Sequence, residues 1–314
     1  MNKVKKIISI LLTAALFACA LILLCSCDPY VNVHVNGVYA VVDTSSNTAT
    51  VCGFDKDESV GPYDAQVCYV PETLTYNGDK YTVTGLFQDG SHSSAFVLNG
   101  HVKRLVIPQT VTYIDLFSFT MSDNFDYLEE IEVRTDNPNY ASLDGVLYTK
   151  DCATLIMYPP AKRSATMYIR SEVTQVYESH WNYCNKYVEK VSVEAGNTVF
   201  SEADGVLLSN GGTRLEYVPY AHDSVLELPN GVQQIARWSL RYANVEHLYL
   251  PASVYNVEYG DNVMYNPLRY VAHLYFEQEQ PLCIAGLSNY LNEVHCGVTR
   301  EEFQQLTKQS TAAE

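Results

Sequence analysis

Apolar and polar residues alternate in short runs along this chain, and each run ends at a turn residue. In Leu248-Tyr249-Leu250-Pro251 the two leucines share one side of an extended strand, and the proline stops the strand because it cannot donate a backbone hydrogen bond. A Val-x-x-Ile spacing follows such runs, as at Val232 and Ile235. It predicts an irregular segment that returns two apolar side chains to the core. The pattern therefore predicts a chain dominated by short strands.

A long segment of the chain recurs at a fixed distance of sixty residues. Residues 128–159 match residues 188–219, so Asp144-Gly145 returns as Asp204-Gly205, and no insertion breaks the register. The other matching pairs are Glu129 with Glu189, Val133 with Val193, Asn137 with Asn197, Leu155 with Leu215 and Pro159 with Pro219. A constant period predicts stacked supersecondary units that share one continuous core.

A shorter unit lies within the long one. Leu228-Pro229 with Ile235 returns twenty-two residues later as Leu250-Pro251 with Val257, within the roughly 20 to 29 residues of a leucine-rich repeat. An Asp-Gly pair between two apolar runs is a strong signal for a β-hairpin. Each sixty-residue unit is therefore predicted to hold about three stacked rungs and one Asp-Gly hairpin.

These motifs resemble the BspA-like leucine-rich repeat family of bacterial surface proteins. The family's leucine-x-isoleucine-proline run is similar to residues 105–114, and its aspartate-glycine-valine-leucine-tyrosine segment to residues 144–148. The resemblance covers residues 30–276 and departs from the family where Ser118-Phe119 and Ser239-Leu240 replace its alanine-phenylalanine pair. It implies an all-β dominated leucine-rich repeat solenoid with short parallel strands in each rung, hairpin insertions, an amino-terminal β cap and a short carboxyl-terminal helix.

The two ends of the chain differ from the repeats. Thr299 and Glu302 have the spacing of a capping box, and Phe303 and Leu306 have helical spacing, so we expect a short helix that closes the carboxyl end. The predicted regions are a lipoprotein signal peptide at 1–26, a lipidated amino terminus with a β-rich cap at 27–100, the repeat array at 101–276 and a carboxyl-terminal cap at 277–314.

The amino terminus is typical of a targeting segment. Three lysines precede an apolar stretch at 7–24, and Leu24-Cys25-Ser26-Cys27 has the form of a lipobox that ends at the acceptor cysteine. The alternative is an uncleaved anchor, because the stretch approaches the ~18 apolar residues of a membrane-spanning helix. Small Ser26 and polar Asp28-Pro29 around Cys27 favour cleavage. The sequence thus predicts an exported chain, lipid-anchored through Cys27 at the bacterial cell envelope or surface.

Six of the nine cysteines follow Cys27. An even number in an exported protein permits disulfides, and nearness in the sequence favours Cys52 with Cys68 and Cys283 with Cys296. The alternative is that these residues are buried thiols that act as small apolar side chains.

The chain is acidic, with a formal net charge of −16. Such a surface repels phosphate, so nucleic acid is not an expected partner. The eight histidines are dispersed without metal-ligand spacing, and the sequence holds no nucleophile elbow or phosphate-binding glycine loop. Glu129-Glu130 lie next to each other on a strand and face opposite ways, unlike the paired carboxylates of a glycosidase. We expect no enzyme activity, no cofactor and no metal site.

Tyrosine is the residue most suited to recognition, because it gives rigid, amphipathic contact area, although strand aromatics also fill cores. The candidates are Tyr39, Tyr81, Tyr148, Tyr158, Tyr217, Tyr220, Tyr249, Tyr259, Tyr265, Tyr270, Trp181 and Trp238. The residues that recur between the copies turn, stop and fill strands, so a binding site is expected among residues that differ between the copies.

The expected function is binding or adhesion by a lipid-anchored surface protein whose repeat platform takes an extracellular protein or glycan. One alternative is a glycan-capturing accessory lipoprotein of an uptake system, and another is a structural envelope spacer. A glycan binder should carry one exposed row of Trp or Tyr, whereas a protein binder should carry a broad mixed patch, and a spacer should lack either.

Overall fold

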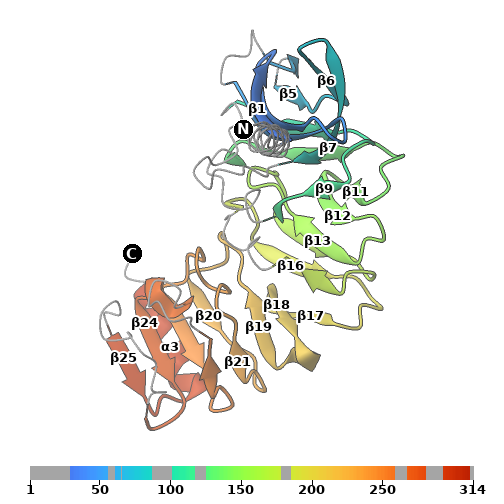
Figure 1. Ribbon diagram of the computed structural model, residues 1–314. Coiled ribbons are helices and arrows are strands. Elements are labelled where there is room, and N and C mark those ends of the chain that lie inside the picture. Colours follow the sequence, from blue (N-terminus) through green and yellow to red (C-terminus); the bar gives the residue numbers. More distant parts are fainter. Residues whose placement is uncertain are drawn as a thin grey trace, which may run out of the picture.

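The computed structural model describes residues 29–55, 61–64, 66–86, 101–116, 125–177, 185–258, 267–280 and 293–311. Short strands stack along an elongated, curved array from the amino-terminal end to the carboxyl-terminal end (Figure 1). The predicted signal peptide and lipidation site at Cys27 lie outside the described residues. In the part of the chain that is described, no helix is long and apolar enough to cross a membrane.

One row of the array holds parallel strands. Leu105 lies opposite Ile131, and Leu248 lies opposite Leu274, and all four side chains are buried. The parallel register keeps these apolar positions in continuous columns across the rungs. The strands of this row are β5 (Val67–Tyr69), β8 (Arg104–Ile107) and β10 (Glu130–Val133), then β14 (Thr166–Ile169) and β16 (Lys190–Val193), then β20 (Val225–Glu227), β22 (His247–Leu250), β24 (His273–Phe276) and β25 (Glu293–Cys296). The two-residue strand β4 (Tyr63–Asp64) pairs antiparallel with β5.

A second row holds hairpins and two-residue strands. The turn at Asp144-Gly145 has φ values of 50° and 74°, and the turn at Asp204-Gly205 has 52° and 75°, as a two-residue type I′ turn requires. The predicted Asp-Gly hairpins are therefore confirmed. The first hairpin pairs β11 (Tyr140–Leu143) with β12 (Val146–Thr149), and its sheet continues through β13 (Thr154–Met157) to β15 (Gln175–Val176). The second hairpin pairs β17 (Phe200–Ala203) with β18 (Val206–Ser209), and its sheet continues through β19 (Arg214–Tyr217) and β21 (Gln234–Ile235) to β23 (Asn256–Val257).

An asparagine clamps each hairpin to the preceding rung. The side-chain amide of Asn137 donates to the carbonyls of Pro108 and Val111, at 2.8 Å each, and its oxygen accepts from the two backbone N–H groups that open the hairpin. Asn197 makes the same four hydrogen bonds in the next unit. The recurrence of this residue after sixty positions thus reflects a structural role.

The amino-terminal strands form a sheet of their own. Val51, Val83 and Leu86 are buried there and belong to one apolar cluster with Leu105 and Ile107 of the first rungs. The core therefore runs without a break from this sheet into the array. The strands are β1 (Tyr30–Val35), β2 (Val38–Asp43), β3 (Thr48–Phe54), β7 (Asp79–Leu86) and β6 (Thr73–Tyr76), with β9 (Tyr113–Ile114) beside β7.

The expected carboxyl-terminal helix is present as α3 (Arg300–Thr311). The Glu302 carboxylate accepts from the backbone N–H of Thr299 at 2.9 Å and from its hydroxyl at 2.8 Å, which confirms the capping box. The helix lies on the outer face of β22 and β24 (Figure 1), where the Phe303 ring packs 5.3 Å from Tyr249 and 5.0 Å from Tyr275. It covers a strand face because two register-matched tyrosines there present apolar surface that burial stabilises.

The predicted Cys52–Cys68 disulfide is not formed. Cys68 is a fully buried thiol in the core, and burial raises the pKa of its sulfhydryl. Cys52 lies on the face of β3 opposite to buried Val51, with its sulfur 3.6 Å from the Thr50 carbonyl. Strand alternation therefore turns the two sulfurs into different environments. Cys296 is likewise a thiol, and its predicted partner Cys283 lies outside the described residues.

Candidate functional site

A groove of about 550 Å³ runs beside the loops that lead into the parallel strands. This volume is within the ~300–1,000 Å³ of typical ligand sites. Loops before β8, β10 and β16 and turns after β13 and β19 contribute to it, so the groove crosses several rungs. Its lining residues are Lys103, Asp126, Tyr127, Glu129, Pro160, Ala161, Arg163, Lys186, Tyr187 and Tyr220.

Three tyrosines give the groove its apolar surface. Tyr127 and Tyr187 stand sixty residues apart, each three residues before a parallel strand. Tyr127 is 57% exposed and Tyr220 is 40% exposed. Tyr187 is half-buried, and the Arg163 guanidinium and the Lys186 ammonium lie 5.6 and 5.3 Å from its ring centroid. The groove thus combines open aromatic rings with one ring that carries two cations.

The charged residues of the groove are loosely paired. Glu129 lies 3.4 Å from the Lys103 ammonium and 3.8 Å from the Arg163 guanidinium, and both cationic side chains are exposed. Exposed ion pairs of this kind contribute roughly 0–1 kcal/mol, so an incoming carboxylate can replace Glu129 at small cost. With Lys186, three cations face the two carboxylates of Asp126 and Glu129. The groove is therefore locally cationic in a chain of formal net charge −16.

A smaller hollow of about 260 Å³ lies beside β15, β18 and β19. Its cation, Arg214, is already paired with Glu216 at 2.8 Å and with Glu258. Because both carboxylates neutralise this guanidinium, the hollow offers a ligand less free charge than the tyrosine-lined groove does.

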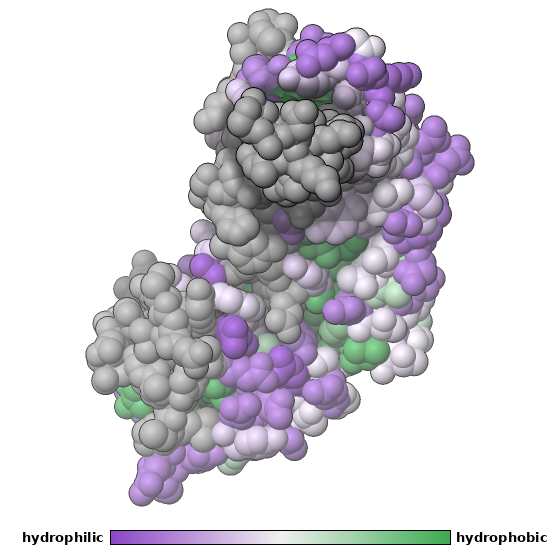
Figure 2. Space-filling view, in the orientation of Figure 1, coloured by the Kyte–Doolittle hydropathy of each residue, from purple (hydrophilic) through white to green (hydrophobic). Residues whose placement is uncertain are grey.

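Among the residues that Figure 2 colours, polar ones cover much of the visible face. Apolar residues come into view in the middle of the array.

Of the tyrosines proposed from the sequence that the structure describes, one lines the groove. That residue is Tyr220, whereas Tyr39 and Tyr270 are exposed elsewhere and Trp238 is half-buried. Tyr81, Tyr148, Tyr158, Tyr217 and Tyr249 are buried, and Tyr259, Tyr265 and Trp181 lie outside the described residues. The sequence reasoning missed Tyr127 and Tyr187, although their common offset of sixty residues was a usable signal.

The structure also gathers histidines that are far apart in the sequence. His247 lies opposite His273 in strand register, and His273 lies opposite Glu293, with His295 on the same outward face as Glu293. The expectation that the histidines are dispersed is wrong for this end of the array. Parallel strands place residues one rung apart side by side, and a search for ligands at helical spacing does not detect that arrangement.

No family model matches the chain, and no curated protein does. Among solved structures, the pneumococcal vaccine antigen PcpA is similar at 14% identity and a TM-score of 0.41, over 87% of this chain and 89% of that one. A leucine-rich cell surface protein from Faecalibacterium prausnitzii is similar at 12% identity and a TM-score of 0.31, over 87% and 97%. A leucine-rich repeat protein from Bacteroides ovatus is similar at 13% identity and a TM-score of 0.33, over 85% and 76%.

The chain resembles bacterial leucine-rich repeat surface proteins. The motifs at residues 105–114 and 144–148 carry this resemblance.

Proposed function

We propose that this chain is a cell-surface protein that binds an extracellular protein through the tyrosine-lined groove, by complementarity and without catalysis. The observation that carries the proposal is the lining of the groove, in which Tyr127, Tyr187 and Tyr220 stand beside Lys103 and Arg163. Tyrosine and arginine dominate the binding hot spots of protein interfaces. Such residues gathered in one hollow across several rungs suit an extended segment of a partner.

A protein ligand fits this lining better than a glycan does. Arg163 and Lys186 occupy the ring of Tyr187, so that ring is less open for stacking against a sugar. The groove is a mixed patch of aromatic, cationic and acidic residues, not a bare row of aromatics. Its local positive charge favours a partner segment that carries acidic side chains.

The array supplies the platform for this groove. We infer that the two rows of strands form a leucine-rich repeat solenoid and that the amino-terminal sheet is its cap. The continuous core of Val51, Leu86 and Leu105 supports this role, because a first rung without a cap leaves an apolar edge exposed.

The proposed location is the bacterial cell envelope or surface, with a lipid on Cys27. The lipobox that ends at this residue supports it. Metabolic labelling with a fatty-acid analogue tests the anchor: we expect the label in the wild type and in the control Cys52→Ala, and no label in Cys27→Ala. Label retained by Cys27→Ala would show that Cys27 is not the lipidated residue.

Binding is tested with the purified full-length chain against a panel of extracellular-matrix and cell-surface proteins and against a glycan array. We expect a protein ligand whose affinity falls at least about 30-fold in Tyr187→Ala and in Arg163→Ala, as hot-spot losses of ~2 kcal/mol imply. Tyr255→Ala removes a tyrosine that is 61% exposed and outside the groove, and it should keep full affinity.

Three results would overturn the proposal in different ways. A glycan that depends on Tyr187 would replace the protein as the ligand. A protein ligand that binds all the variants equally would move the site away from the groove. Binding to neither class would favour the envelope spacer.

A further inference from the structure

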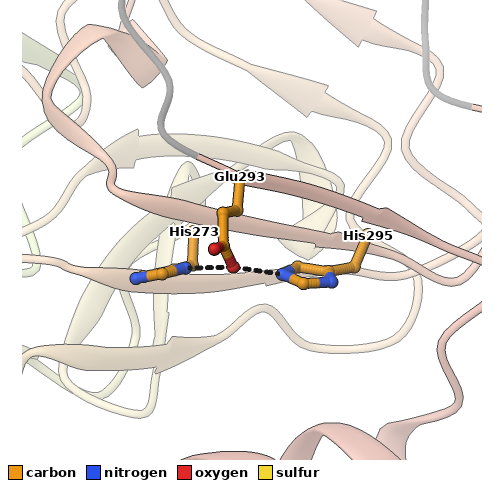
Figure 3. A group of neighbouring side chains, drawn as sticks. All are labelled: His273, Glu293 and His295. Carbon is orange, nitrogen blue, oxygen red and sulfur yellow. Dashed lines mark ion pairs between the residues drawn. The ribbon is translucent and has the colours of Figure 1, made fainter.

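Three side chains converge on the outer face of β24 and β25, the last two parallel strands in the described part of the chain (Figure 3). His273 belongs to β24, Glu293 and His295 belong to β25, and His273 lies opposite Glu293 in strand register. One carboxylate oxygen, Oε2 of Glu293, lies 3.3 Å from Nδ1 of His273 and 3.2 Å from Nε2 of His295. All three candidate ligand atoms lie within 4.8 Å of one another.

We propose that His273, Glu293 and His295 bind a divalent transition-metal ion of the zinc class. Two imidazole nitrogens and one carboxylate oxygen are ligands that Zn²⁺ takes in proteins, with bond lengths of about 2.0–2.2 Å. Neighbouring ligand atoms around a tetrahedral ion at such distances are roughly 3.3–3.5 Å apart. The two nitrogen–oxygen distances of 3.3 and 3.2 Å lie at this spacing, so only the two imidazoles have to approach one another.

An ordinary ion pair explains this cluster less completely. Nε2 of His295 is shielded from solvent and has no hydrogen bond of acceptable geometry, although Glu293 is only 3.2 Å away. A cation between the two groups would satisfy both atoms at once. The Glu293 side chain is 57% exposed and the His273 side chain 30%, so an ion can enter from solvent and keep a fourth position open for water or another ligand.

The neighbouring rings hold the two imidazoles in place. The His273 ring stacks on His247 at 4.5 Å with 8° between the ring planes, and the His295 ring stacks on Tyr275 at 4.6 Å with 9°. His247 and Tyr275 are joined in turn by a 3.1 Å hydrogen bond between Nδ1 and the phenol oxygen. Fixed ligand orientations reduce the ordering that metal binding requires, as supporting contacts do in other metal sites.

The ion would have a structural consequence. It would join β24 to β25, the last parallel strand in the described part of the chain, and so resist fraying of the terminal rung. A ligand that binds only the folded state raises the free energy of unfolding. Zn²⁺ is therefore expected to raise the unfolding temperature of the array.

The test uses the full-length chain after a chelator has removed bound metal. Calorimetry measures Zn²⁺ binding, and thermal unfolding with and without Zn²⁺ measures its effect on stability. We expect the wild type to bind one equivalent of Zn²⁺ and each of His273→Gln, Glu293→Gln and His295→Gln to bind it at least about tenfold more weakly, since loss of even an outer partner of a metal ligand weakens metal sites ~10–100-fold. The rise in unfolding temperature that Zn²⁺ causes in the wild type should disappear in these three variants. His101→Gln, which changes a histidine in the first rungs, should leave both unchanged.

Thiols are the competing ligands, because Cys152 and Cys296 are free and thiolates bind Zn²⁺ well. A Co²⁺-loaded wild-type chain distinguishes the two cases without any variant, and it should show no thiolate-to-cobalt charge-transfer band. That band, an absence of Zn²⁺ binding by the wild type, or equal Zn²⁺ binding by all the variants would overturn the site.

Discussion

The two matching segments, residues 128–159 and 188–219, build the same frame, but the residues that flank them differ where they border the groove. They share the clamps at Asn137 and Asn197, with the same four hydrogen bonds, and both Asp-Gly turns have nearly identical φ values. Around the groove the equivalent pairs are Asp126 and Lys186, Pro160 and Tyr220, and Arg163 and Asp223. The comparison teaches that the recurring clamps and turns carry the architecture, whereas the groove combines two recurring tyrosines, Tyr127 and Tyr187, with charged residues that differ between the copies.

The largest effect is expected at the clamps. Asn137→Ala removes four hydrogen bonds at a fully buried site and should lower the free energy of unfolding by about 2–5 kcal/mol. Asn197→Ala removes the same four bonds where water has partial access, so its loss should be smaller, about 1–3 kcal/mol. Urea unfolding measures both values.

Asn139→Ala is the control for the clamps, because its exposed side-chain amide makes one bond, to the Thr112 carbonyl. Its loss in free energy of unfolding should be smaller than that of Asn137→Ala and of Asn197→Ala. Equal losses in all three variants would mean that the clamps do not organise the copies.

The turns should show the next largest effect. Gly145→Ala and Gly205→Ala place a side chain at φ of +74° and +75°, with the new Cβ 2.8 Å from Glu130 Cγ and 2.9 Å from Lys190 Cβ. Strain of this kind costs about 1–3 kcal/mol. Because Cβ of Lys190 is tied to its backbone while Cγ of Glu130 rotates, the loss should be greater at Gly205.

Gly211→Ala is the matched control for the turns, with φ of +68° and nothing within 4 Å of the added Cβ. It should lose less stability in urea unfolding than either turn variant. If Gly211→Ala lost as much stability as Gly145→Ala and Gly205→Ala, the whole effect would come from backbone strain and none from the close approach of the neighbouring strand.

The smallest expected effect is a dependence of stability on pH that only the first copy has, through Asp151. The Thr149 hydroxyl and the Ala153 N–H hold the pKa of Asp151 below its usual value, whereas the second copy has Gly211 at this position. A lowered carboxyl pKa adds stability above the unfolded value of about 3.9 and loses it as pH falls through the folded value. Wild type and Asp151→Asn should therefore differ slightly in unfolding midpoint above about pH 4 and converge below it. A difference that is independent of pH would exclude this contribution.

The sequence predicts those features whose cause is local. The Asp-Gly turns, the Thr299–Glu302 capping box and the proline-ended strands all follow from backbone requirements within a few residues. Nearness in the sequence misleads for Cys52 and Cys68, because strand alternation decides which side chain enters the core.

The groove, the position of α3 and the histidine cluster depend on long-range register. His273 meets Glu293, and Tyr249 meets Tyr275, only because the segments of chain between the strands have particular lengths. A single sequence with irregular loop lengths does not fix that register, so these sites become visible only once the strands are placed.

The most direct test of the central claim is the ligand affinity of the double variant Arg163→Asp with Lys186→Asp. Each change installs the residue that the other copy holds at the equivalent position, Asp223 and Asp126. We expect an unchanged unfolding midpoint and an affinity at least about 100-fold weaker, as loss of well-placed charge pairs implies. Lys80→Asp with Arg237→Asp makes the same change in net charge outside the groove and should bind normally. An affinity that is unchanged in the first double variant, or that falls equally in both, would contradict the assignment of binding to the residues that differ between the copies.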